Sequence, residues 1–224
     1  MNDDARVILA LAAEADDEFI WNHLTVIQAE MFRAGPVSIK FAYYGAEDAL
    51  QIRPFITTRW IVDADDMAEM MERGRADCVC GCFIDVGDLL ATALKEAQEG
   101  PVRAVIIIGD HFHGDLDAAI ARAKQLRAAG TRLFLFQQGR SNETEKAFRT
   151  LAEPTSGAYF KFQPTIERIA ETLPQLLEAV THFAIGGMHA LAEANNSSAN
   201  LLIEQMCDES LFDATDLSIR NFRQ

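Results

Sequence analysis

Apolar and polar positions change their spacing several times along residues 6–162 of the chain. Short apolar runs, which are typical of strands, alternate with longer segments whose apolar side chains recur at helical spacing. The clearest strand is "VRAVIIIGD" at 102–110, whose continuous apolar character is expected of a parallel strand covered by helices on both faces. The expected strands are 6–13, 37–45, 51–60, 102–110, 131–139 and 157–162, and the expected helices are 16–32, 63–75, 86–100, 116–130 and 142–153.

The order of these segments predicts the fold class. Strands that alternate with helices build a doubly wound, mostly parallel sheet with helices on both faces, which is an α/β three-layer sandwich of the Rossmann type. Residues 37–45 and 51–60 follow one another with only a polar turn between them, so we expect them to form a hairpin.

The pattern becomes helical after residue 163. Residues 164–194 read as one long helix, with Pro174 and the pair Gly186–Gly187 as expected kinks, and 195–206 as a short helix. We therefore expect an α/β domain at 1–163 and, packed on it, a helical extension with a tail at 164–224. The small side chains around the glycine pair would let another helix approach closely, within the same domain or in a homodimer.

Charge argues against two classes of partner. The chain carries 20 basic and 34 acidic residues, a formal net charge of −14, which repels nucleic-acid phosphates and anionic membrane surfaces. No apolar run approaches the roughly 20 residues of a membrane span, and the acidic start lacks the basic region of a secretory signal. We therefore expect a cytoplasmic protein.

Three cysteines alternate in "DCVCGCF", at Cys78, Cys80 and Cys82. In an extended segment their side chains share one face, and free cysteine is among the most buried residue types. A reducing compartment keeps such thiols unpaired. Small core residues are the expected role, and a redox or metal-binding role is the alternative.

Several motifs in residues 6–162 resemble the von Willebrand factor type A (VWA) domain family. In that family a strand ending in Asp is followed by a helix, by a strand of the type G-[VT]-[RK]-[VL]-[FY]-x-[FI]-x-x-G, by a helix containing L-A, and by [ST]-G-G-x-[YF]-[FY]. The matching positions here, in order, are Asp110, 130–139, 151–152 and 156–160, with weaker matches upstream at 53–58 and 86–94. The resemblance implies a doubly wound sheet with one antiparallel edge strand.

The resemblance also implies a metal site, which this sequence has altered. VWA domains commonly bind Mg²⁺ or Mn²⁺ through a D-x-S-x-S motif after the first strand, a Thr from a middle loop and an Asp after a later strand. Here the first motif reads "AAEAD", with Glu14 and Asp16 at the Ser positions and an alanine at that of Asp. Ile84 stands at the Thr position, although Asp85 beside it carries oxygens. Only Asp110 matches, so the metal-ion-dependent adhesion site is degenerate.

Polar residues after neighbouring strands are expected to line one crevice, because the carboxyl ends of parallel strands meet at one edge of the sheet. Three interpretations stay open. In the first, the residues are solvated and Asp110 caps or braces the next helix. In the second, the carboxylates bind Mg²⁺ or Mn²⁺. In the third, the histidines and a cysteine bind a softer ion such as Zn²⁺. The candidate metal ligands are Glu14, Asp16, Asp85, Asp110, His111 and His113.

Two classes of function follow. The resemblance implies a non-enzymatic protein-interaction module whose partner is another protein, such as an AAA+ ATPase, beside which bacterial members of the family often act. Loops on a rigid sheet are favoured places for recognition. The alternative is that Phe83 and Phe112 turn inward and pack in the core. The expected contact residues are Phe83, His111, Phe112 and His113.

The second class is a small metal-dependent enzyme or a metal-binding protein. The sequence supplies no nucleophile with a base beside it, which favours the interaction module. This alternative would be centred on Glu14, Asp16, Asp110, His111 and His113.

Overall fold

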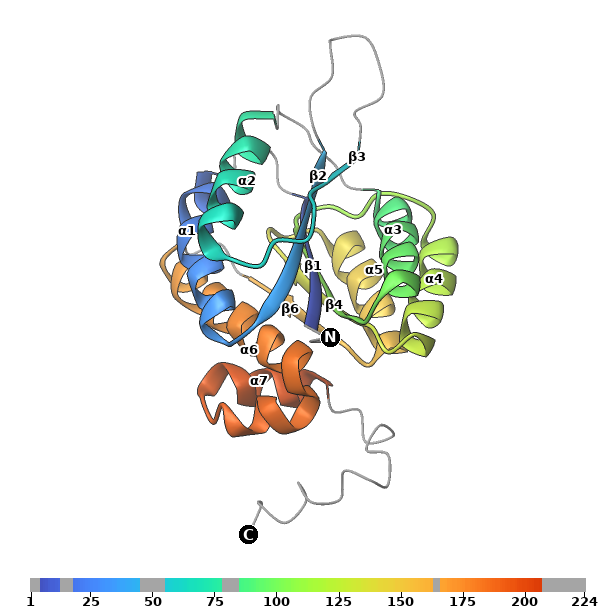
Figure 1. Ribbon diagram of the computed structural model, residues 1–224. Coiled ribbons are helices and arrows are strands. Elements are labelled where there is room, and N and C mark those ends of the chain that lie inside the picture. The colour runs from blue at the N-terminus through green and yellow to red at the C-terminus, as the bar shows by residue number, and fades with distance from the viewer. Residues whose placement is uncertain (1–4, 13–17, 45–54, 78–84, 163–165, 207–224) are drawn as a thin grey trace.

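Figure 1 shows a computed structural model of the chain, in which a central sheet lies between two layers of helices. The structure describes residues 5–12, 18–44, 55–77, 85–162 and 166–206. Within them, no helix has both the length and the apolar character needed to cross a membrane.

The sheet has six strands in the order β3-β2-β1-β4-β5-β6. All neighbouring strands are parallel except β2 and β3, which pair in the antiparallel sense at one edge. The predicted doubly wound sheet with one antiparallel edge strand is therefore confirmed. The strands are β1 (Ala5–Ala12), β2 (Val37–Tyr44), β3 (Phe55–Thr57), β4 (Val102–Gly109), β5 (Arg132–Gln137) and β6 (Ala158–Lys161).

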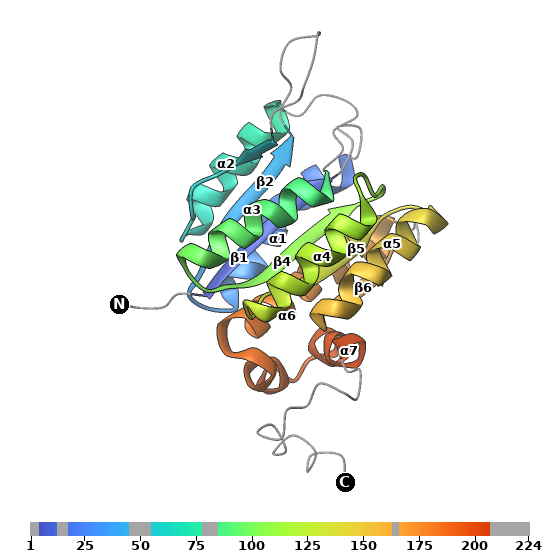
Figure 2. The same ribbon diagram turned by 90° about the vertical axis from the view of Figure 1, so that its right-hand side faces the viewer.

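Helices cover both faces of this sheet. One face carries α1 (Glu18–Arg33), α2 (Ala64–Asp77) and α6 (Ile166–Glu193) (Figures 1 and 2). The opposite face carries α3 (Val86–Glu99), α4 (Leu116–Ala128) and α5 (Asn142–Ala152), which leads into a short 3₁₀ turn, η1 (Glu153–Thr155). The last helix, α7 (Ser197–Met206), lies below the amino ends of the strands (Figure 1).

One hydrophobic core joins the sheet to the helices. Every residue of β4 except Arg103 is buried, as its apolar run predicts for a central parallel strand. Leu173 and Leu177 of α6 belong to the same core cluster as Val7 of β1. The first helix of the expected C-terminal extension thus packs on the sheet, while the division into 1–163 and 164–224 stays a prediction.

Helix α6 is broken where the sequence predicts a break. Gly186 (φ −136°, ψ 16°) and Gly187 (φ 66°, ψ −154°) leave the helical conformation, whereas Pro174 is accommodated inside the helix. The positive φ of Gly187 is readily adopted only by glycine, so the kink depends on this residue.

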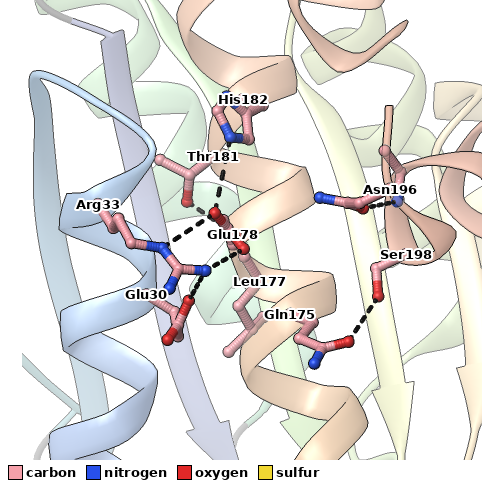
Figure 3. A network of polar contacts seen from close by, with 10 residues as sticks. Glu30, Arg33, Gln175, Leu177, Glu178, Thr181, His182, Asn196 and Ser198 are labelled. Atoms are coloured by element: carbon pink, nitrogen blue, oxygen red, sulfur yellow. Dashed lines mark hydrogen bonds and ion pairs between the residues drawn. The ribbon is translucent and has the colours of Figure 1, made fainter. Parts of the chain in front are cut away.

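A polar network fastens α6 to α1 (Figure 3). Glu178, which is almost fully buried, accepts hydrogen bonds from Nε (3.3 Å) and Nη2 (2.9 Å) of Arg33. The hydrogen bond to Glu178 raises the pKa of the Arg33 guanidinium above its usual value. His182 Nε2 lies 3.8 Å from the same carboxylate. The two helices are therefore held in register by a charge pair at the margin of an apolar interface.

Close backbone approach makes Gly157 indispensable between η1 and β6. A Cβ atom at this position would lie 1.7 Å from the carbonyl oxygen of Leu133 in β5, a contact that only a backbone shift could relieve. We expect Gly157→Ala to lower the free energy of unfolding by more than about 2 kcal/mol in urea denaturation.

Gly100→Ala is the matched control, because its φ of 172° suits any residue and the atoms nearest to its Cβ belong to the movable guanidinium of Arg6. We expect this variant to change stability by less than about 1 kcal/mol. Equal stability of the two variants would contradict the steric argument.

Candidate functional site

The candidate site lies where β1, β4 and β5 end, and we call this side of the sheet the carboxyl edge. The chain winds in opposite directions from β1 and β4, which is the place where open α/β sheets form a crevice for ligands. Ala12 pairs with Gly109 at the ends of these two strands. Asp110 follows Gly109 directly, so the structure places it at the carboxyl edge, after the end of β4.

The carboxylate of Asp110 is only half satisfied. Its Oδ2 lies 2.8 Å from Nδ1 of the adjacent His111, while its Oδ1 is buried and has no hydrogen-bond partner among the residues that the structure describes. Leaving a buried acceptor without a donor costs about 1–3 kcal/mol. A buried oxygen of this kind calls for an explanation, and an ordered water or a bound ion is one.

A second unpartnered oxygen belongs to the neighbouring strand end. Gln138 follows β5, its backbone N–H donates to the Gly109 carbonyl (2.9 Å), and its residue surface is 7% exposed. The side-chain Oε1 of Gln138 is buried and, like Oδ1 of Asp110, finds no hydrogen-bond donor in the described part of the chain. Carboxylate and amide oxygens are donors that Mg²⁺ or Mn²⁺ accepts, so the donor chemistry fits a hard cation.

The loop after Asp110 separates its three candidate contact residues. His111 and His113 are exposed, and their ring centroids lie 6.3 Å apart. Phe112 between them is half-buried and packs against the hydrophobic core. The histidines therefore lie at the surface, while Phe112 anchors the loop in the core. The other predicted aromatic contact, Phe83, lies outside the described residues.

Asp85 joins this loop to helix α3. Its side chain caps the helix by accepting a hydrogen bond from the backbone N–H of Asp88 (3.1 Å). Asp85 also forms a parallel bridge with His113, through a hydrogen bond from the Val86 N–H to the His113 carbonyl (3.1 Å). A Cβ atom on Gly114 would lie 2.9 Å from Oδ1 of Asp85, so the loop and the cap are in close contact.

Helix α4 is capped by a residue that the sequence analysis did not single out for this role. Asp115 accepts hydrogen bonds from the backbone N–H groups of Asp117 (2.9 Å) and Ala118 (3.2 Å). The expectation that Asp110 caps this helix is therefore wrong. The alternative in which Asp110 braces the helix stays a prediction.

The described residues do not complete a metal centre. Within 5–12, 18–44, 55–77, 85–162 and 166–206, no group of three or more His, Cys, Asp or Glu side chains is arranged to hold a metal ion. Glu14, Asp16 and the three neighbouring cysteines Cys78, Cys80 and Cys82 lie outside the described residues. Both metal hypotheses, with hard oxygens or with histidine and cysteine, stay predictions.

Gln138 is the site residue that the sequence analysis missed. The same reasoning that selected Asp110, a polar residue directly after a buried parallel strand, applies to "LFQQG" at 135–139. An amide lacks the charge that drew attention to the acidic residues. Gln138 is a candidate because its Oε1 is buried and has no hydrogen-bond partner among the described residues. The sequence reveals neither of these facts.

Solved structures with the same arrangement of strands and helices share little sequence with this chain. A von Willebrand factor type A protein from Catenulispora acidiphila has 16% identity and a TM-score of 0.56, over 82% of this chain and 43% of its own. The SpRpn10 VWA domain has 14% identity and a TM-score of 0.53, over 79% and 94%. Manganese-loaded TRAP protein from Plasmodium vivax has 10% identity and a TM-score of 0.50, over 77% and 74%.

These similarities confirm the predicted resemblance at the level of the fold, which is that of a VWA domain. The chain spans less than half the length of the Catenulispora protein. No protein-family model matches the sequence, and no match is found among curated proteins.

Asp85 caps α3 and contacts the loop after Asp110. Two variants separate the effect of its capping hydrogen bond from that of its charge. Asp85→Ala removes the acceptor for the first turn of α3, so we expect urea denaturation to show a loss of about 1 kcal/mol. Asp85→Asn keeps a capping oxygen and should remain within about 0.5 kcal/mol of the wild type. If the two variants lose the same stability, the negative charge of Asp85 matters more than its capping bond.

Proposed function

We propose that this chain is a non-enzymatic protein-interaction module of the cytoplasm that recognises its partner at the carboxyl edge. The observation that carries the proposal is the exposed pair His111 and His113, held above a half-satisfied Asp110 on a VWA fold. Recognition residues are commonly carried by loops that a rigid scaffold positions.

The loop is suited to recognition because it is fixed on both sides. The bridge to Asp85 holds His113, and the side chain of Phe112 anchors the middle of the loop in the core. The cap by Asp115 fixes the start of the next helix. A preorganised loop loses little conformational entropy on binding, which favours affinity.

The overall charge of −14 favours a partner with a basic surface. Opposite charges steer two proteins together, and salt screens this attraction. An AAA+ ATPase is the partner class that we propose from the family resemblance. A homodimer through the C-terminal helices is a second proposal, supported by the exposed apolar side chains of Ile185 and Leu201.

We further propose that the carboxyl edge binds Mg²⁺ or Mn²⁺. Oδ1 of Asp110 and Oε1 of Gln138 would act as ligands, with Glu14 and Asp16 as further oxygen donors. A bound hard cation supplies positive charge and a coordination position for a partner carboxylate. The manganese-loaded TRAP protein, which shares the fold, lends support. The same residues would serve the alternative function of a metal-binding protein or small metal-dependent enzyme.

The cation proposal predicts a thermal shift that depends on the two unpartnered oxygens. Mg²⁺ or Mn²⁺ at ten times the dissociation constant should stabilise the wild type by about 1.4 kcal/mol and raise Tm by about 3 °C. Asp110→Ala and Gln138→Leu should each abolish this shift, whereas Cys80→Ser should retain it. Absence of a shift for the wild type at millimolar concentrations of either ion would refute the cation site.

The partner proposal is tested by removing the imidazoles and keeping Phe112. The double variant His111→Ala/His113→Ala should fold normally by circular dichroism and lose the main protein captured from native lysate. The matched control is His189→Ala, which removes another strongly exposed histidine, on α6. Capture should also weaken as the salt concentration rises. Retention of the partner by the folded double variant would move the interaction away from the carboxyl edge.

A further inference from the structure

A pocket at the opposite end of the sheet has a chemistry unlike the rest of the molecule. It lies at the amino ends of β4 and β5, next to the end of α4 and the kink of α6, and has a volume of about 400 Å³. Pockets for small ligands commonly range from about 300 to 1,000 Å³, so its size is adequate for one. The residues of this arginine pocket that matter most are Arg103, Arg127, Arg132, Phe183, Gly187 and Met188.

Three arginines from three elements line this pocket, and none of the described residues in its wall is acidic. Arg103 comes from β4, Arg127 from the last turn of α4 and Arg132 from the start of β5. The chain as a whole has 34 acidic and 20 basic residues. A local excess of positive charge in such a protein marks a place where an anion is attracted rather than repelled.

Four other arginines of the chain use their charge within the protein. Arg33, Arg59, Arg73 and Arg149 each pair with a carboxylate. Across the part of the chain that the structure describes, no carboxylate pairs with Arg103 or Arg127. Their guanidinium groups are therefore available to an anion from outside.

The third arginine is fixed in orientation. Nη1 of Arg132 donates to the Ser156 carbonyl (2.8 Å), and its guanidinium carbon lies 5.1 Å from the ring centroid of Phe183. An aromatic ring that stacks on a guanidinium holds the plane of the group. A fixed, planar set of N–H donors is well suited to carboxylate or phosphate oxygens.

The α6 side of the pocket is apolar and open. Phe183, Ile185 and Met188 contribute apolar side chains. The kink at Gly187 turns the chain out of the helix, and a Cβ atom on this glycine would meet nothing within 4 Å. An apolar wall facing charged donors selects a ligand that combines an apolar part with a negative charge.

We propose that the arginine pocket binds an oxyanion, a phosphate or a carboxylate, attached to a small apolar or aromatic group. Arg103 and Arg127 bind the anion, Arg132 orients it, and Phe183 with Met188 contacts the apolar part. The site lies at the other end of β4 from Asp110, so it is separate from the partner surface proposed at the carboxyl edge and does not depend on it. Ile185 of its wall also belongs to the face proposed for a homodimer.

Isothermal titration calorimetry with the full chain tests this site. Phenyl phosphate and benzoate serve as probes that share a ring and differ in the oxyanion, and inorganic phosphate lacks the ring. We expect at least one ring-bearing probe to bind at least about threefold more tightly than inorganic phosphate, and the stronger of the two identifies the preferred oxyanion. Failure of both aromatic probes to bind at millimolar concentrations overturns the proposal.

Two variants locate the binding. Arg103→Gln/Arg127→Gln should weaken the better probe by at least about tenfold. The control Arg59→Gln/Arg73→Gln removes the same charge from arginines outside the pocket and should change binding by less than about twofold. Equal weakening in both double variants would show a general charge effect and overturn the site.

A third variant keeps the test decisive if the arginine pair proves necessary for folding. Met188→Glu places a carboxylate in the apolar wall, where it would compete with the probe for the arginines. Circular dichroism should show an intact fold, and binding should fall by at least about tenfold. Unchanged binding in the folded Met188→Glu variant would place the probe elsewhere and overturn the proposal.

Discussion

The backbone pairing of β4 with a parallel strand on each side is the interaction on which the rest of the structure depends. Ile106 pairs with Leu9 of β1 on one side and with Phe134 of β5 on the other. Because β4 is buried between two helical layers, its backbone groups cannot bond to water and must be satisfied by these ladders. The pairing therefore fixes both ends of β4. These ends carry the carboxyl edge and the arginine pocket, the two places to which we assign a role.

The two ends of β4 differ in charge. The carboxyl end leads into Asp110 and the histidine loop, where acceptor oxygens are in excess, and Gln138 adds another from β5. The amino end carries Arg103 and lies beside Arg127 and Arg132, where donors are in excess. A single rigid strand therefore separates a surface suited to cations and basic partners from a pocket suited to anions.

The relation to VWA domains rests on architecture far more than on residues. Identities of 10–16% accompany the shared fold, because burial patterns and chain connections can be kept while most side chains change. The motif comparison predicts that the family's metal-ligand positions are largely replaced, with Asp110 kept and Ile84 at the Thr position. Function therefore has to be inferred from the side chains present here and not from the fold.

The sequence alone determined the α/β class, the antiparallel edge, the break at the glycine pair and the position of Asp110. These follow from local periodicity and from rules of strand connection, which neighbouring residues along the chain specify. Tertiary structure alone decided that Phe112 packs on the core between two exposed histidines and that Asp115 caps α4. It also left the buried Gln138 oxygen without a hydrogen-bond partner among the described residues. It also gathered Arg103, Arg127 and Arg132 with Phe183. Such outcomes depend on side-chain direction and on distances between residues far apart in sequence, and neither periodicity nor composition encodes those quantities.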